Sequence, residues 1–186
     1  MDKLYNDSIH GHILLPSYLF KFIDTPEFQR LRRIKQTGVV NLVFSGAVHD
    51  RAMHSIGVAY LANKMAKKIK KKFPDAGMTD NLIKLITISG LLHDIGHGPM
   101  SHNFELIARK INPNYSHEDT SCRIIDRFSD KFDSKEDVEM VKNIIQGNIP
   151  EGEKRYFIYE IVSNPTTSID VDKMDYFVRD SKYANI

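Results

Sequence analysis

Cysteine is nearly absent from this chain, which has only Cys122 among its 186 residues. A single cysteine excludes a disulfide framework and a four-thiolate zinc site. It also fits a reducing compartment, so we expect a cytoplasmic or nuclear, intracellular protein. The N-terminus, MDKLYNDSIHG, is polar and lacks the apolar core of a signal peptide. We therefore do not expect secretion.

Long apolar runs and an excess of one charge are missing as well. The longest uncharged apolar stretch, near residues 85–92, is much shorter than the roughly 20 residues that span a bilayer, so we expect a soluble protein with no membrane partner. Lys plus Arg number 26 against 24 Asp plus Glu, a net charge of +2, which gives little support to nucleic-acid binding. The length suits one compact domain that needs no metal or disulfide merely to fold.

Apolar residues recur at spacings of three and four between Pro and Gly residues, which predicts an all-α fold. Residues 1–15 are predicted to form an extended or hairpin segment, and VVNLVF at 39–44 is the one convincing strand-like run. No repeat or linker indicates a second domain, so we expect one domain over 1–186, with an N-terminal segment at 1–50 and a helical core at 51–186. The predicted helices begin after Pro16 and Pro26 and then cover about 51–73, 80–92, 101–111, 117–128, 135–146, 154–163 and 171–183.

Histidines provide the strongest functional signal, because several of the eight lie beside aspartates. The segment LLHDIGHGPMSH at 91–102 leads from apolar residues directly into four polar ones. On a helix His93 and His97 share a face, while Asp94, rotated by about 100°, still reaches an ion over the helix end. The adjacent His–Asp pair is therefore a candidate half of a metal site.

Two other segments supply matching groups. HDRAMH at 49–54 places Arg51 and His54 on one helical face, and IDVDKMDYFVRD at 169–180 does the same for Asp172 and Tyr176. Mixed imidazole and carboxylate ligation suits Fe, Mn or Zn, and open coordination positions suit a hydrolytic ion. The predicted metal ligands are His54, His93, Asp94 and Asp172, with Arg51, Lys173, His97 and His117 near enough to neutralise a polyphosphate.

Five ordered sequence blocks together resemble a known family. They read NDSIHGHI, IDTPEFQRLRRIKQTG, VFSGAVHDRAMHSIGVAYLA, GLLHDIGHGPMSH and YEIVSNPTTSIDVDKMDYFVRD. The sequence is similar to the HD-domain metal phosphohydrolases, and most of all to the deoxynucleoside triphosphate (dNTP) triphosphohydrolases of the sterile-alpha-motif and HD-domain type. The resemblance implies a helical HD core and hydrolysis at the α-phosphorus, which releases deoxynucleoside and intact triphosphate.

The resemblance also implies roles for individual residues. His54, His93, Asp94 and Asp172 match the family's metal ligands, and His102 would protonate the leaving 5′-oxygen. Glu105 stands where the closest relatives have an aspartate, and the ring of Tyr176 would exclude a 2′-hydroxyl. The implied catalytic group is His97, His102, His117 and Glu105, and the implied substrate contacts are Gln36, Arg51, Lys173, Tyr176 and Asp180.

Regulation and assembly are implied in the same way. The N-terminal block is similar to the guanine-nucleotide activator site of tetrameric relatives, so the resemblance implies a GTP or dNTP activator, Mg²⁺ bound with nucleotide, and a homo-oligomer. The family's domain continues beyond the IDVDKxDY block, whereas this chain stops at Ile186, so we expect a truncated domain. The implied activator residues are Lys3, Asn6, Asp24, Gln29 and Arg32.

Other functions remain open. The metal site alone does not select a substrate, so an HD phosphohydrolase of a monophosphate, a cyclic nucleotide or a guanosine polyphosphate is one alternative. A module that binds nucleotide or nucleic acid, or joins a relative's oligomer, is another. The individual residues also have structural explanations: hydrogen-bonded polar groups at helix ends, surface salt bridges in the N-terminal helices, a core position for Tyr176 and a solvated face for the lysines of 63–73.

Overall fold

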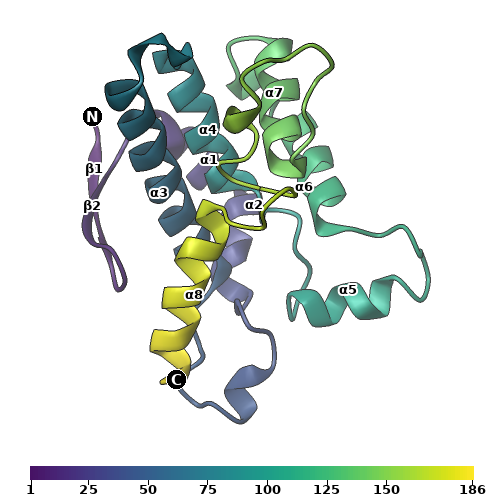
Figure 1. Ribbon diagram of the computed structural model, residues 1–186. Coiled ribbons are helices and arrows are strands. Elements are labelled where there is room, and N and C mark those ends of the chain that lie inside the picture. Colours follow the sequence, from purple (N-terminus) through teal and green to yellow (C-terminus); the bar gives the residue numbers. More distant parts are fainter.

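The computed structural model describes residues 1–186 and is dominated by helices (Figure 1). The predicted all-α fold with an N-terminal hairpin is confirmed. No helix combines the length and the apolar character that crossing a membrane requires. The elements are β1 (Lys3–Asp7), β2 (Gly11–Leu15), α1 (Phe20–Ile23), α2 (Pro26–Gln29), α3 (Arg51–Lys72), α4 (Asp80–Leu92), α5 (His102–Ala108), α6 (His117–Asp126), α7 (Lys135–Gln146) and α8 (Val171–Ala184).

Side-chain caps define where the longer helices begin. The side-chain oxygen of Thr79 accepts a hydrogen bond from the Leu82 amide at the start of α4. Ser116 caps α6 and Ser134 caps α7 in the same way, and each is followed by two acidic residues that favour a helix N-terminus. At α8 the cap is Asp170, which places Asp172 in the first turn of that helix.

The core forms where α3 packs lengthwise against α4, with α7 against the other side of α4 and α8 across α3 (Figure 1). The close approach of α3 and α4 depends on Gly90, because a side chain there would meet the Cα of Ala59 and the Cβ of Ala62 at 3.2 Å. Twenty-one buried apolar residues form the main cluster, and a second cluster of 13 lies between α3, α4 and the segment before α8. This packing fixes the helix ends that carry the polar residues of the site.

Two expected elements are wrong. VVNLVF is not a strand: Val40–Leu42 forms a short 3₁₀ turn, and Leu42 and Val43 are each about 80% exposed. No neighbouring strand pairs with this segment, so its apolar pattern has nothing to stabilise it as β-structure.

The segment 154–163 contains only the 3₁₀ turn Tyr156–Ile158 instead of a helix. The carbonyl of Ile161 accepts from the amide of Val171 and so joins this segment to the start of α8. Its buried side chains therefore anchor a connecting segment to the core.

Candidate metal centre

Three helix ends bring the predicted metal ligands together. His54 comes from the first turn of α3, His93 and Asp94 from the end of α4, and Asp172 from the first turn of α8. Ligand atoms of His54, His93 and Asp172 all lie within 4.8 Å of one another. The two oxygens of Asp94 lie beside this trio, 3.4 Å from Nε2 of His93 and 3.6 Å from Nε2 of His54.

Both imidazoles are turned so that one nitrogen faces the centre. Nδ1 of His54 lies 2.8 Å from Asp175, and Nδ1 of His93 lies 2.9 Å from the carbonyl oxygen of Gly90. The two Nε2 atoms are buried and make no hydrogen bond, although Nε2 of His54 is 2.8 Å from Asp172. Buried polar atoms without partners are costly, so their convergence beside two carboxylates fits a bound cation.

The carboxylates of the centre also favour a positive charge between them, as the pKa values of its residues indicate. Burial alone would lower the pKa of His54, but Asp172, Asp175 and Asp94 raise it to about 10. Burial likewise opposes ionisation of Asp94, yet Arg51 and the neighbouring imidazoles hold the pKa of this carboxyl well below its usual range. The carboxylates are therefore ionised at neutral pH, and the position in front of the two Nε2 atoms attracts a cation.

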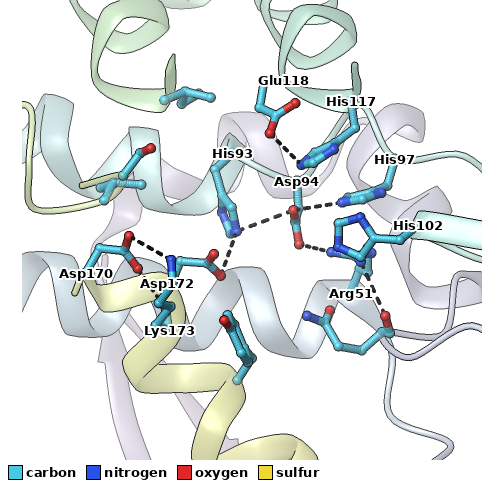
Figure 2. A pocket seen from close by; sticks show the side chains of 15 residues that line it. Arg51, His93, Asp94, His97, His102, His117, Glu118, Asp170, Asp172 and Lys173 are labelled. Carbon is cyan, nitrogen blue, oxygen red and sulfur yellow. Dashed lines mark hydrogen bonds and ion pairs between the residues drawn. The ribbon is translucent and has the colours of Figure 1, made fainter. Parts of the chain in front are cut away.

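A cavity of about 320 Å³ opens in front of the centre (Figure 2). Its lining includes two cationic side chains, Arg51 and Lys173, and a group of three histidines. His97, His102 and His117 come close together: the rings of His97 and His117 stack at 3.8 Å, and that of His102 meets both edge-on. Burial lowers the pKa of His97 to about 3, so its ring is neutral at physiological pH.

Glu105 links two of these histidines. Its Oε2 lies 3.3 Å from Nδ1 of His102 and 3.3 Å from Nδ1 of His117, while Oε1 accepts from Arg109. Burial would raise the pKa of Glu105, but the two histidines and Arg109 lower it. With Nδ1 on this carboxylate, Nε2 of His102 is left for the cavity, whereas Nε2 of His117 lies 3.4 Å from Oε1 of Glu118. The four residues predicted as catalytic therefore form one cluster.

A second cavity, of about 350 Å³, adjoins the first and shares Gln36, Arg51, His102 and Tyr176 with it. Asp180 lines this second cavity, and its Oδ1 lies 2.6 Å from Nε2 of the buried His49. The five residues predicted to contact substrate are thus together along two connected cavities. Tyr176 is half-buried, which does not match a core position.

The predicted activator residues lie apart from these cavities. Lys3 and Asn6 are on β1, where the Lys3 ammonium lies 4.0 Å from the centre of the Phe20 ring. Asp24 follows α1, and Arg32 donates to the side chain of Gln29 across 2.9 Å. Lys3, Asn6, Asp24 and Arg32 are exposed.

Sequence reasoning missed the residues behind the centre. Asp175 and Arg179 are completely buried, and Arg179 also donates to Asp7 of the hairpin. Ser101 is buried as well and accepts from Nε of Arg51. The spacing of four residues between Asp175 and Arg179 on α8 could have indicated that these two side chains pair. Nothing local in the sequence pointed to Asp7 or Ser101.

In this helical scaffold an adjacent His–Asp pair lies beside one further His and one further Asp. This arrangement is typical of the HD class of metal-binding proteins. The family model described as HD domain matches residues 51–180, and this chain belongs to that family. HD-family membership implies a divalent metal ion, and the His and Asp groups of the centre supply ligands for one.

Relatives extend the similarity to nearly the whole chain. It is 44% identical over 188 residues to the deoxynucleoside triphosphate triphosphohydrolase SAMHD1 homolog of Dictyostelium discoideum, which covers 97% of this chain and 36% of that protein. The match to deoxynucleoside triphosphate triphosphohydrolase SAMHD1 of Gallus gallus is 39% identical and covers 99% and 34%. A putative HD domain-containing protein L394 of Acanthamoeba polyphaga mimivirus is 42% identical, with 99% and 44% covered. The chain spans about a third of the length of the first two relatives.

Proposed function

We propose that this chain carries the catalytic centre of a metal-dependent phosphohydrolase that cleaves dNTPs to deoxynucleoside and triphosphate. The observation that carries the proposal is the convergence of two unpartnered imidazole nitrogens and two carboxylates beside a cavity with cationic and histidine side chains. Similarity to proteins named deoxynucleoside triphosphate triphosphohydrolases supports the choice of substrate.

His54, His93, Asp94 and Asp172 hold the metal ion in this proposal. Two imidazoles with two carboxylates suit Fe, Mn or Zn, and Mg²⁺ enters with the nucleotide. An ion held there would lower the pKa of a water molecule and polarise a phosphate oxygen. Asp175 and the Gly90 carbonyl hold the Nδ1 protons of the two imidazoles, so that both Nε2 lone pairs face the ion.

Arg51 and Lys173 bind the triphosphate. The Arg51 side chain is buried and already donates to Asp94 and Ser101, so its position along the cavity is fixed before substrate arrives. Gln36 and Asp180 contact the sugar, and Tyr176 closes the space that a 2′-hydroxyl would need. The position of these three residues along the second cavity supports a nucleoside bound there.

His102 donates a proton from Nε2 to the leaving 5′-oxygen. Its Nδ1 lies 3.3 Å from Oε2 of Glu105, and this contact orients the ring so that Nε2 is the atom left to face the cavity. His117 shares the same Glu105 oxygen and borders the same cavity, so it helps to keep the carboxylate and the acid aligned. The neutral ring of His97 lies between this group and Asp94 and takes part as a hydrogen-bonding group of the site.

A guanine nucleotide or dNTP activator binds at Lys3, Asn6, Asp24, Gln29 and Arg32, and the active form is a homo-oligomer. The exposed cations Lys3 on β1 and Arg32 after α2 support an anionic ligand on this side of the chain. Arg30, next to Gln29, donates to the carbonyl oxygens of Ile95 and His97 across 2.6 Å. These hydrogen bonds link the segment that carries Gln29 and Arg32 directly to the turn that carries His97.

The test is product analysis. Purified protein is incubated with each dNTP and Mn²⁺ or Fe²⁺, with and without GTP, and the products are separated by chromatography. Deoxynucleoside with intact triphosphate is the expected result, and stimulation by GTP supports the activator site. Orthophosphate, pyrophosphate or a linearised cyclic nucleotide from other substrates instead indicates a different HD phosphohydrolase. Metal and nucleotide binding without turnover indicates a binding module.

A further inference from the structure

A buried carboxylate connects the metal centre to the N-terminal hairpin. Oδ2 of Asp175 lies 2.8 Å from Nδ1 of His54, and Oδ1 of Asp175 lies 2.6 Å from Nε2 of His10. His10 belongs to the turn between β1 and β2 and is separated from Asp175 by 165 positions in the chain. The Asp175 side chain is fully buried and that of His10 is 13% exposed.

Asp175 has no acceptor capacity left in this arrangement. Arg179 donates to Oδ2 from Nε at 2.7 Å and to Oδ1 from Nη2 at 2.9 Å, which gives each carboxylate oxygen two partners. An ionised carboxylate offers about four acceptor positions, so the four donors fill it. Since Asp175 only accepts, both imidazoles must carry a proton on the nitrogen that faces it. When the ring of His54 is neutral, its proton is therefore on Nδ1, and the Nε2 lone pair is free for a metal ion.

The surrounding chain holds this carboxylate in one place. Gly57 leaves the necessary space, because a Cβ there would come within 2.1 Å of Asp175 Oδ1. The hairpin turn is held in turn by Asp7, whose Oδ1 accepts from the amides of Ile9 and His10. Nη2 of Arg179 reaches the same carboxylate. The His10 ring lies 5.3 Å from that of Tyr60, which orients it against α3.

We propose that His10 is a positioning residue of the metal centre, which acts through Asp175 on the tautomer and orientation of His54. The hairpin is then part of the metal site, and displacement of its turn weakens metal binding without touching a ligand. This inference rests on the metal centre of the proposed function, but not on its substrate. Groups that hold a ligating imidazole from behind commonly change metal affinity by 10-fold to 100-fold.

The test compares the Mn²⁺ dissociation constants of the full chain and its variants, measured from free Mn²⁺ by electron paramagnetic resonance. His10→Ala removes the donor, whereas His10→Gln keeps an N–H near the position of Nε2. His12→Ala, at an exposed histidine two residues away on β2, is the matched control. We expect about tenfold weaker Mn²⁺ binding in His10→Ala, near wild-type binding in His10→Gln, and no change in His12→Ala. Mn²⁺ affinity that is unchanged in His10→Ala while its unfolding temperature falls would mean a purely structural role and overturn the proposal.

Imidazole ¹⁵N–¹H spectra of the wild-type chain give an answer even if His10→Ala does not fold. The proposal requires a proton on Nδ1 of His54 and on Nε2 of His10, and a bare nitrogen at either position overturns it. Wild-type protein that binds Mn²⁺ no better than Asp172→Ala would refute the metal centre of the proposed function, while these spectra still test the contact of His10 with Asp175. Loss of dNTP hydrolysis with intact, His10-dependent Mn²⁺ binding would refute only the proposed substrate.

Discussion

Nη1 of Arg51 donates to Oδ2 of Asp94 across 2.5 Å, and both side chains are buried. The residue proposed to bind phosphate is therefore also the partner of a proposed metal ligand. Oδ2 also lies 3.6 Å from Nε2 of His54, and Oδ1 lies 3.4 Å from Nε2 of His93. This pair joins the start of α3 to the turn after α4, so metal binding, phosphate binding and local stability share one contact.

Arg51→Ala should destabilise the fold. Removal of the guanidinium takes away the principal cationic partner of the buried Asp94, and breaking a buried ion pair typically costs about 3–5 kcal/mol. Denaturant unfolding of the metal-free protein measures the loss. Arg33→Ala, at an exposed arginine of the nearby 3₁₀ segment Arg30–Arg33, is the control and should change stability by less than about 0.5 kcal/mol. Equal stability of the two variants would show that the buried pair contributes nothing.

Asp172→Ala should abolish metal retention and turnover together. It removes the carboxylate that faces both His54 and His93, and the remaining Asp94 is already paired with Arg51. Metal content by elemental analysis and product formation are the two readouts. The control is Asp133→Ala, which removes an exposed carboxylate that pairs only with Lys84. Full activity in Asp172→Ala would exclude the proposed ligand set.

Glu105→Gln should lower kcat by roughly 100-fold, the lower end of what a positioned proton donor contributes. The amide has one acceptor oxygen where the carboxylate has two, so it cannot hold both histidines and Arg109 in their present positions. Glu105→Asp keeps the charge, so it should recover most of the rate. Metal content should stay at the wild-type level in both variants. Wild-type kcat in Glu105→Gln would remove this carboxylate from the proton-transfer scheme.

Cys122 should react slowly with alkylating reagents in the folded protein. Burial raises the pKa of its thiol to about 11, against roughly 8.5–9 for an unfolded cysteine. At neutral pH the thiolate fraction of Cys122 is therefore about 100-fold lower in the folded protein than in the unfolded chain. This fraction rises as the pH approaches 11. Iodoacetamide labelling across pH 7–10, native against urea-unfolded, measures this. A native rate that levels off near pH 9 would contradict the raised pKa.

Local patterns predicted much of the scaffold. Apolar spacing indicated α4 and α8 nearly to the residue, because this signal depends on neighbours within one or two helical turns. The residues proposed for the centre also came from short motifs. VVNLVF had the same kind of local signal, but a strand also needs a partner elsewhere in the chain, and none pairs with it here.

Long-range contacts behind the centre had no such signal. His10 lies in a polar turn and Asp175 in a helix 165 positions later, so only the packing of the hairpin against α3 and α8 brings them together. The same is true of His49 and Asp180, which are 131 positions apart. Each of these residues looks like an ordinary surface polar group in the sequence. Their burial follows from tertiary structure, which residue spacing does not encode.

Hydrolysis of a dNTP in ¹⁸O-labelled water tests the central claim most directly. Attack on the α-phosphorus with departure of the 5′-oxygen places one ¹⁸O atom in the triphosphate and none in the deoxynucleoside. Mass spectrometry of both products from the Mn²⁺-loaded chain, with Asp172→Ala as the inactive control, gives the answer. Labelled triphosphate with unlabelled deoxynucleoside is the predicted result. Label in the deoxynucleoside, or products that are deoxynucleoside monophosphate and pyrophosphate, would contradict the proposed reaction.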